Sequence, residues 1–197
     1  MNLANKITMS RVVLSIVIMS ILLFPFDELG VELPSYVIHG NIFIEVKYLV
    51  AGVLFIIASF TDFLDGRVAR KYNMVTDFGK MVDAISDKML TNSLLVILAS
   101  DGMISPVIAV IFIVRDIVVD SIKMVVGNKG HAVAAIGVAK VKTATLMVGL
   151  TLTLFYNLPF EFWGIRVSDC LLIISAVLSL ISAFQYYSMS RSYIEVR

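Results

Sequence analysis

Residues 62–87 read DFLDGRVARKYNMVTDFGKMVDAISD, a charged stretch that overlaps the ends of two apolar runs at 46–66 and 79–99. Each run is long enough to cross a bilayer as one helix. Basic residues between Arg67 and Lys71 indicate that the connection faces the cytoplasm, because cytoplasmic connections collect lysine and arginine. The stretch therefore predicts two antiparallel spanning helices whose charged ends meet at the cytoplasmic surface.

The rest of the chain is similarly apolar. Of its 197 residues, 59% are hydrophobic and 16% are charged, whereas about 25% are charged in ordinary soluble domains. Apolar runs that could span a bilayer occur at 8–25, 46–66, 79–99, 104–125, 140–157 and 168–190. We expect an all-α integral membrane protein with a single domain over residues 1–197, in which a short interfacial helix near Asn5 precedes six transmembrane helices. The net charge of +1 argues against a polyanion-binding surface.

Charged residues alternate in sign between successive connections. Basic residues gather near both termini and in every second connection, and they are Lys6, Arg11, Arg67, Arg70, Lys71, Lys123, Lys129, Lys140, Lys142, Arg191 and Arg197. The positive-inside tendency then predicts a multi-pass protein of the cytoplasmic membrane with both termini in the cytoplasm. The longest outer connection, residues 27–45, is rich in turn-forming residues and is expected to be a loop.

Four aspartates lie at helical spacing within the charged stretch. Asp62 and Asp65 are three residues apart and Asp83 and Asp87 are four apart, so each pair shares one helix face. Carboxylates at this depth are costly unless they are paired or bind metal. Antiparallel packing would bring both pairs together, and one or two divalent cations would offset their repulsion. A site with only oxygen ligands favours Mg²⁺ or Mn²⁺ over Zn²⁺.

A simpler explanation is that these aspartates pair with neighbouring cations at the interface. The available cations are Arg67, Arg70, Lys71, Lys80 and Lys88. Pairing of this kind readily explains one aspartate, but it explains four aspartates on two matching faces less well. Both explanations stay open on the residues alone.

Residues 62–87 resemble the motif of the CDP-alcohol phosphatidyltransferase family, in which two aspartates three apart are followed by Gly, Ala-Arg, Gly and two aspartates four apart. The matching positions are Asp62, Asp65, Gly66, Ala69, Arg70, Gly79, Asp83 and Asp87. The resemblance implies a six-helix membrane bundle, usually dimeric, with a polar active-site cavity that faces the cytoplasm. It also implies transfer of a phosphatidyl group from CDP-diacylglycerol to an alcohol, with release of CMP.

Roles for individual residues follow from the same resemblance. It implies that Asp62, Asp65 and Asp83 bind metal and that Asp87 is the general base and also contacts a second metal ion. The positions that resemble the nucleotide- and donor-binding ones are Asn5, Thr8, Gly66, Ala69, Arg70, Thr76 and Gly79. The residue types suit this reaction, because a pyrophosphate donor needs cations on its oxygens and a carboxylate can take the proton of an attacking hydroxyl.

The fourth and fifth apolar runs carry further charges, which are Arg115, Asp116, Asp120, Lys123, Lys140 and Lys142. Charges in such surroundings indicate function, and Arg115, Lys140 and Lys142 are candidates for binding the phosphate of an acceptor. The simpler explanations are a salt bridge from Arg115 to Asp116 or Asp120 and a role for the two lysines as cytoplasmic anchors.

Two short segments bear on the acceptor alcohol. The pattern Asn5, Thr8 and Arg11 and the stretch VAKVKT at 138–143 resemble the bacterial members of the family that make phosphatidylglycerophosphate, which implies sn-glycerol 3-phosphate as the acceptor. The chain departs from that subgroup in having no proline before Asn5 and in having Thr145 near an expected glutamine. An inositol phosphate would also suit a basic pocket, whereas serine would not need one.

Two other kinds of membrane protein also use carboxylates on helices. A prenyl-diphosphate transferase would need a second aspartate-rich motif and more spans, which the sequence lacks. A divalent-cation transporter would place acidic residues near the bilayer midplane, whereas the motif here lies at one face beside Arg70. Metal-dependent exchange of labelled CMP into CDP-diacylglycerol would distinguish the transferase from the transporter.

Overall fold

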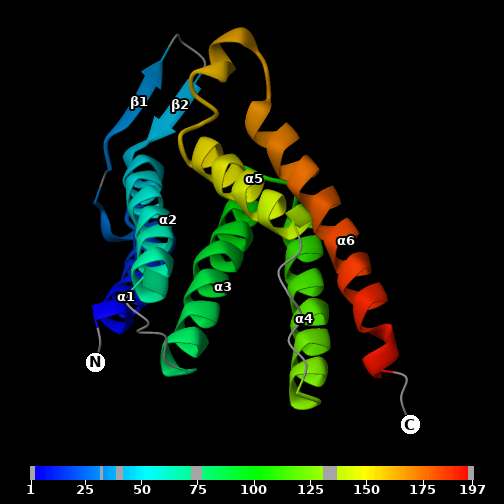
Figure 1. Cartoon of the computed structure of the whole chain (residues 1–197). Coiled ribbons are helices and arrows are strands. Elements are labelled where there is room, and N and C mark those ends of the chain that lie inside the picture. Colours follow the sequence, from blue (N-terminus) through cyan, green and yellow to red (C-terminus); the bar gives the residue numbers. More distant parts are fainter. Residues whose placement is uncertain (1–2, 32, 39–41, 72–76, 131–136, 195–197) are drawn as a thin grey trace.

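The computed structural model describes residues 3–31, 33–38, 42–71, 77–130 and 137–194, although not the side chains of residues 3–7, 27, 38, 42, 62–71, 77, 80 and 194. Within these ranges the chain forms six α-helices: α1 (Leu3–Leu23), α2 (Val46–Lys71), α3 (Asp77–Ser100), α4 (Pro106–Asn128), α5 (Gly137–Leu154) and α6 (Val167–Ile194). Each helix coincides with one predicted apolar run, so the expectation of an all-α chain with six main helices is confirmed (Figure 1).

Helices α1 and α2 extend furthest beyond their predicted apolar runs, α1 at its start and α2 at its end. Helix α1 is continuous from Leu3, so the prediction of a separate interfacial helix near Asn5 was wrong. Residues 3–23 contain no glycine or proline that could interrupt the helix. Helix α2 continues to Lys71, so the basic segment from Arg67 is helical and not a turn. Most residues of this segment favour a helix, and a single glycine at position 66 is tolerated.

Helix α1 packs against both α2 and α3, while α5 packs against α6 and α2, and α4 packs against α6 and α3. The first turn of α1, the last turns of α2 and α6 and the first turn of α3 all lie at the same end of the bundle (Figure 1). The motif-bearing ends of α2 and α3 therefore lie at the end where the described chain begins and finishes.

The opposite end carries a two-stranded antiparallel sheet, β1 (Ser35–Ile38) and β2 (Ile42–Glu45), in which Ser35 pairs with Glu45. The expectation of a plain loop was wrong here, because β-branched and aromatic residues favour strands over this short distance. Two 3-10 helices, η1 (Asp27–Leu29) and η2 (Phe160–Trp163), lie in the connections that follow α1 and α5. The amide of Glu45 donates a hydrogen bond of 3.0 Å to the hydroxyl of Tyr156, which attaches the sheet to the turn after α5.

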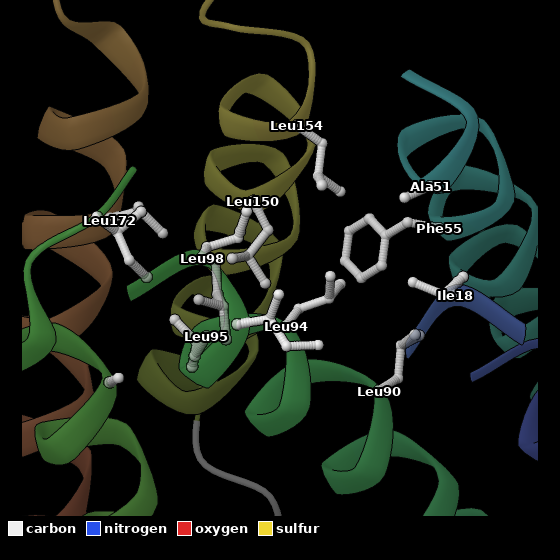
Figure 2. Close-up of a cluster of buried hydrophobic side chains, with 14 of the residues drawn as sticks. Ile18, Ala51, Phe55, Leu90, Leu94, Leu95, Leu98, Leu150, Leu154 and Leu172 are labelled. Carbon is white, nitrogen blue, oxygen red and sulfur yellow. The ribbon is translucent and has the colours of Figure 1, made fainter. Parts of the chain in front are cut away.

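All six described helices contribute to the apolar core, and α4 does so through Phe112. Ile18, Phe55, Leu94, Leu150 and Leu172 come from α1, α2, α3, α5 and α6, and all are fully buried (Figure 2). Small residues allow close packing at its edge: a Cβ atom on Gly52 would lie 2.7 Å from the Phe155 ring. Packing of this kind holds the helix ends that carry the polar residues in fixed relative positions.

The outer faces of the helices are also apolar. Every helix carries large apolar side chains that are more than half exposed, among them Val13, Phe60, Val96, Val114, Val148 and Phe184. Water-soluble monomers rarely expose so much apolar surface, whereas lipid covers such a surface readily. The helical segments Gly137–Leu154 and Val167–Tyr193 are long and apolar enough to cross a membrane. The fold is thus consistent with an all-α membrane protein.

Candidate active site

The two halves of the aspartate motif lie on different helices. Asp62, Asp65, Gly66, Ala69 and Arg70 lie in the last turns of α2, and its helical backbone puts Asp62 and Asp65 one turn apart on one face. Their side chains lie outside the described part of the chain, as does all of Thr76. The convergence of all four carboxylates therefore stays a prediction.

Asp83 and Asp87 lie one turn apart near the start of α3, and both accept a hydrogen bond from the same atom of α1. Nη1 of Arg11 lies 2.9 Å from Asp83 Oδ1 and 3.1 Å from Asp87 Oδ1. The same Nη1 also donates to Ser86 Oγ at 3.3 Å. Among the side chains that the structure describes, Arg11 thus pairs with both motif aspartates of α3, although it was not among the cations that the sequence analysis considered for this role.

Arg11 belongs to a buried stripe along α1. The stripe consists of Thr8, Arg11, Ser15, Ile18 and Leu22, whose spacing of three and four residues follows one helix face. Its first three members are polar and its last two are apolar. The face of α1 that packs against α2 and α3 is therefore polar at the motif end and apolar beyond it.

This stripe is a signal that sequence reasoning could have used. The apolar members Ile18 and Leu22 predict the buried face of α1, and three- and four-residue steps back along the helix reach Ser15, Arg11 and Thr8. A buried arginine needs a carboxylate or a similar partner, and the motif supplies the nearest candidates. By charge alone, Arg11 is only one of the basic residues that indicate a cytoplasmic end.

The carboxylates of Asp83 and Asp87 suit a divalent cation. Their side chains are 49% and 45% exposed, whereas that of Arg11 is fully buried, so Arg11 holds them from the protein side. Carboxylate oxygens are the donors that Mg²⁺ and Mn²⁺ prefer. Two of the four predicted metal ligands are therefore side by side and accessible.

A second charged cluster joins α4, α5 and α6. Arg115 Nη1 lies 2.9 Å from Asp116 Oδ1, and Lys142 Nζ lies 3.3 Å from the same oxygen. Arg115 also donates to the Ser179 carbonyl oxygen at 3.2 Å and to Ser182 Oγ at 2.6 Å. The salt bridge from Arg115 to Asp116 was one of the simpler explanations, and it is present.

Lys88 connects this cluster to the motif, since it follows Asp87 on α3. It forms an ion pair with Asp120 and lies within electrostatic range of Asp116, Lys123 and Arg115. Sequence reasoning considered Lys88 only as a partner for the motif aspartates. Its position between α3 and α4 depends on packing and is not evident from spacing.

Two further lysines, Lys140 and Lys123, lie at exposed positions. Lys140 is exposed at the start of α5, while the Nζ atom of Lys123 lies 4.9 Å from the centre of the Tyr186 ring. Within the described residues, the cluster has the cations Lys88, Arg115, Lys123 and Lys142 and the anions Asp116 and Asp120. The four cations outnumber the two carboxylates of the cluster, and this excess of positive charge suits the binding of phosphate groups.

The comparisons with known proteins agree with this chemistry. Residues 1–184 match the family model of the CDP-alcohol phosphatidyltransferases. The chain is similar to a CDP-diacylglycerol–glycerol-3-phosphate 3-phosphatidyltransferase of Bacillus subtilis, with 36% identity over 187 residues that cover 95% of this chain and 94% of the relative. Proteins of the same name are similar in Mycoplasma genitalium (33% identity; 85% of this chain, 68% of the relative) and Rickettsia typhi (29% identity; 98% of each).

Proposed function

Because the chain belongs to the CDP-alcohol phosphatidyltransferase family, we propose that it transfers the phosphatidyl group of CDP-diacylglycerol to sn-glycerol 3-phosphate, forming phosphatidylglycerophosphate and releasing CMP. The chain is a transferase of this family. The acceptor is the one named for the similar proteins of Bacillus subtilis and Mycoplasma genitalium. The observation that carries the proposal is the half-exposed carboxylate pair of Asp83 and Asp87 on α3, the helix that also contributes Lys88 to the cation cluster.

Members of the family generally depend on a divalent metal. In our proposal Asp62, Asp65, Asp83 and Asp87 hold one or two Mg²⁺ or Mn²⁺ ions. The bound cation supplies charge stabilisation for the pyrophosphate oxygens and for the departing CMP. The accessible carboxylates of Asp83 and Asp87 support this assignment, and the helical spacing of Asp62 and Asp65 is compatible with it.

Asp87 is the proposed general base. It accepts the proton of the acceptor's hydroxyl, whose oxygen bonds to the phosphorus that carries the diacylglycerol group, and the bond from that phosphorus to the CMP oxygen breaks. A carboxylate positioned in this way accelerates attack by about 10²–10⁴-fold. The contact with Arg11 supports the role, because it restrains the carboxylate beside Asp83.

The phosphate of glycerol 3-phosphate is proposed to bind at the cation cluster. Arg115 and Lys142 were expected to take part, and Lys88 joins them because it lies next to Asp87 on α3. Lys140 is exposed and would act at the entrance. The excess of cations over Asp116 and Asp120 supports an anionic acceptor, since a neutral alcohol would not require it.

The donor side of the proposal rests on the resemblance of the motif. Asn5, Thr8, Gly66, Ala69, Arg70, Thr76 and Gly79 are proposed to bind the nucleotide and the pyrophosphate. Thr8 is buried on the same stripe of α1 as Arg11, which supports its place in the site. Arg70 suits a bidentate contact with phosphate oxygens.

We further propose that the protein is a homodimer in the cytoplasmic membrane, with six spans and with both termini and the active site facing the cytoplasm. The exposed apolar side chains on all six helices support the spans. The basic residues at the motif end of the bundle support the orientation.

The test uses the purified full-length chain with CDP-diacylglycerol and a panel of alcohols that includes glycerol 3-phosphate, inositol phosphate and serine. We expect metal-dependent release of CMP with glycerol 3-phosphate and exchange of labelled CMP into the donor. Replacement of Asp87 by asparagine should abolish turnover and leave nucleotide binding intact. Absence of both CMP release and exchange in the presence of Mg²⁺ or Mn²⁺ would contradict the proposed reaction and favour cation transport.

A further inference from the structure

Arg11 connects the two motif aspartates of α3 to a helix that lies outside the motif. Its Nη1 atom contacts Oδ1 of Asp83 at 2.9 Å and Oδ1 of Asp87 at 3.1 Å. The two carboxylates therefore converge on a single nitrogen atom. Without a cation between them, carboxylates one helical turn apart repel each other and favour separated rotamers.

The contact is made from inside the protein. The guanidinium of Arg11 is fully buried, whereas about half of each carboxylate side chain is exposed. Arg11 thus reaches the carboxylates from the packed side of α3 and leaves an accessible side for other ligands. This geometry differs from that of a surface salt bridge, in which both partners are hydrated and mobile.

The packing of α1 also holds Arg11 in place. Thr8 and Ser15 are buried on the same stripe, and Ser15 Oγ donates to the Arg11 carbonyl oxygen at 2.8 Å. Helix α1 packs against both α2 and α3. A rigid helix thus delivers the guanidinium to a fixed point beside the motif.

We propose that Arg11 is a positioning residue, which holds the carboxylates of Asp83 and Asp87 side by side in the arrangement that binds the divalent cation and that aims Asp87 at the acceptor hydroxyl. Groups behind metal ligands that fix their orientation typically affect affinity or activity by about 10–100-fold. The catalytic part of this inference rests on the proposed reaction, whereas the metal-binding part rests only on the proposed metal ligands.

The test replaces Arg11 by lysine in the full-length protein. Lysine keeps the positive charge, so the long-range electrostatic effect on a divalent cation changes little. Its side chain is shorter, so its nitrogen cannot reach the point at which Arg11 Nη1 meets both carboxylates. The readouts are Mn²⁺ binding by electron paramagnetic resonance without substrate, kcat, the KM for CDP-diacylglycerol, and thermal unfolding.

We expect Arg11→Lys to raise the Kd for Mn²⁺ about 10–100-fold and to lower kcat by a similar factor. The KM for CDP-diacylglycerol should change much less. The matched control is Arg166→Lys at the opposite end of the bundle, where Arg166 is 81% exposed and lies 3.5 Å from Asp169. This control should keep wild-type values for all four readouts.

A second variant keeps the inference testable if Arg11→Lys does not fold. Ser86→Ala removes the 3.3 Å contact with Arg11 and leaves all charges in place. Loss of one such hydrogen bond should raise the Kd for Mn²⁺ by about 2–10-fold. If Arg11→Lys folds, unchanged Mn²⁺ affinity and unchanged kcat in that variant would overturn the inference. If only Ser86→Ala folds, unchanged Mn²⁺ affinity in Ser86→Ala would overturn it.

The outcome separates this inference from the proposed reaction. In one outcome, Arg11→Lys weakens Mn²⁺ binding, but the wild type neither exchanges CMP nor makes phosphatidylglycerophosphate. This outcome would support the positioning role of Arg11 and contradict the proposed reaction. Active wild-type protein whose Arg11→Lys variant binds Mn²⁺ and turns over normally would support the reaction and contradict positioning.

Discussion

Asp116 lies between two buried cations, and its removal should destabilise the protein strongly. Its Oδ1 atom lies 2.9 Å from Arg115 Nη1 and 3.3 Å from Lys142 Nζ, and the side chains of Asp116, Arg115 and Lys142 are only 15%, 9% and 8% exposed. Asp116→Asn keeps the shape and removes the charge that both cations share. Loss of one partner from a buried ion pair costs about 3–5 kcal/mol, because the remaining charge stays buried without compensation.

The expected loss can be measured as a change in melting temperature. A chain of this size loses roughly 2–4 °C for each kcal/mol, so Asp116→Asn should melt about 6–20 °C below the wild type. Circular dichroism at 222 nm, recorded on detergent-purified protein, follows the helical signal. The control is Asp169→Asn, which breaks a 3.5 Å pair with the exposed Arg166 and should cost only about 0–1 kcal/mol.

A double variant tests the electrostatic explanation. Lys142→Met in the Asp116→Asn background removes one of the two uncompensated cations. It leaves an apolar side chain near Phe112, whose ring centre lies 4.8 Å from Lys142 Nζ in the wild type. The double variant should therefore melt above Asp116→Asn, and the two substitutions should not be additive. A melting temperature for Asp116→Asn within about 2 °C of the Asp169→Asn control would refute the reasoning.

Two further predictions concern the acceptor and alkaline pH. Lys88→Met should raise the KM for glycerol 3-phosphate about 10–100-fold, because it removes a charge-assisted contact with the phosphate. The KM for CDP-diacylglycerol should stay nearly constant. Equal changes in both KM values would exclude Lys88 from the acceptor site. Burial raises the pKa of the Tyr156 hydroxyl above its usual value of 10.0. The neutral hydroxyl therefore contributes fully to folding stability below about pH 10, and this contribution is lost as the pH rises through the raised pKa. As the pH rises above about 10, the melting temperature of the wild type should therefore fall more steeply than that of Tyr156→Phe, and parallel curves would contradict this assignment.

The helices could be predicted from the sequence because length and apolarity are sufficient signals. The run at 104–125 corresponds to α4 (Pro106–Asn128), and the run at 46–66 corresponds to the first part of α2. The end of α2 was missed, since a search for apolar runs stops where Arg67 begins a charged but still helical segment. The sheet at 35–45 was missed because its strands are only four residues long.

The candidate site was predictable where its residues are close in sequence. Asp83 and Asp87 share a helix face by spacing alone, and their shared position is confirmed. The contact with Arg11 joins residues 72 positions apart, and the pairing of Lys88 with Asp120 depends on how α3 meets α4. Such contacts depend on three-dimensional packing, which spacing rules do not describe.

The buried arginine of α1 also has a consequence for how the protein is made. Arg11 leaves the ribosome 72 residues before Asp83, which corresponds to about 4–14 s at synthesis rates of roughly 5–20 residues per second. Helices α1 and α2 both precede Asp83 and Asp87 in the chain, so they leave the ribosome before the carboxylates that will meet the guanidinium. The two-carboxylate contact can therefore form only after α3 has been delivered, which makes completion of this centre a later event than the entry of the first two helices.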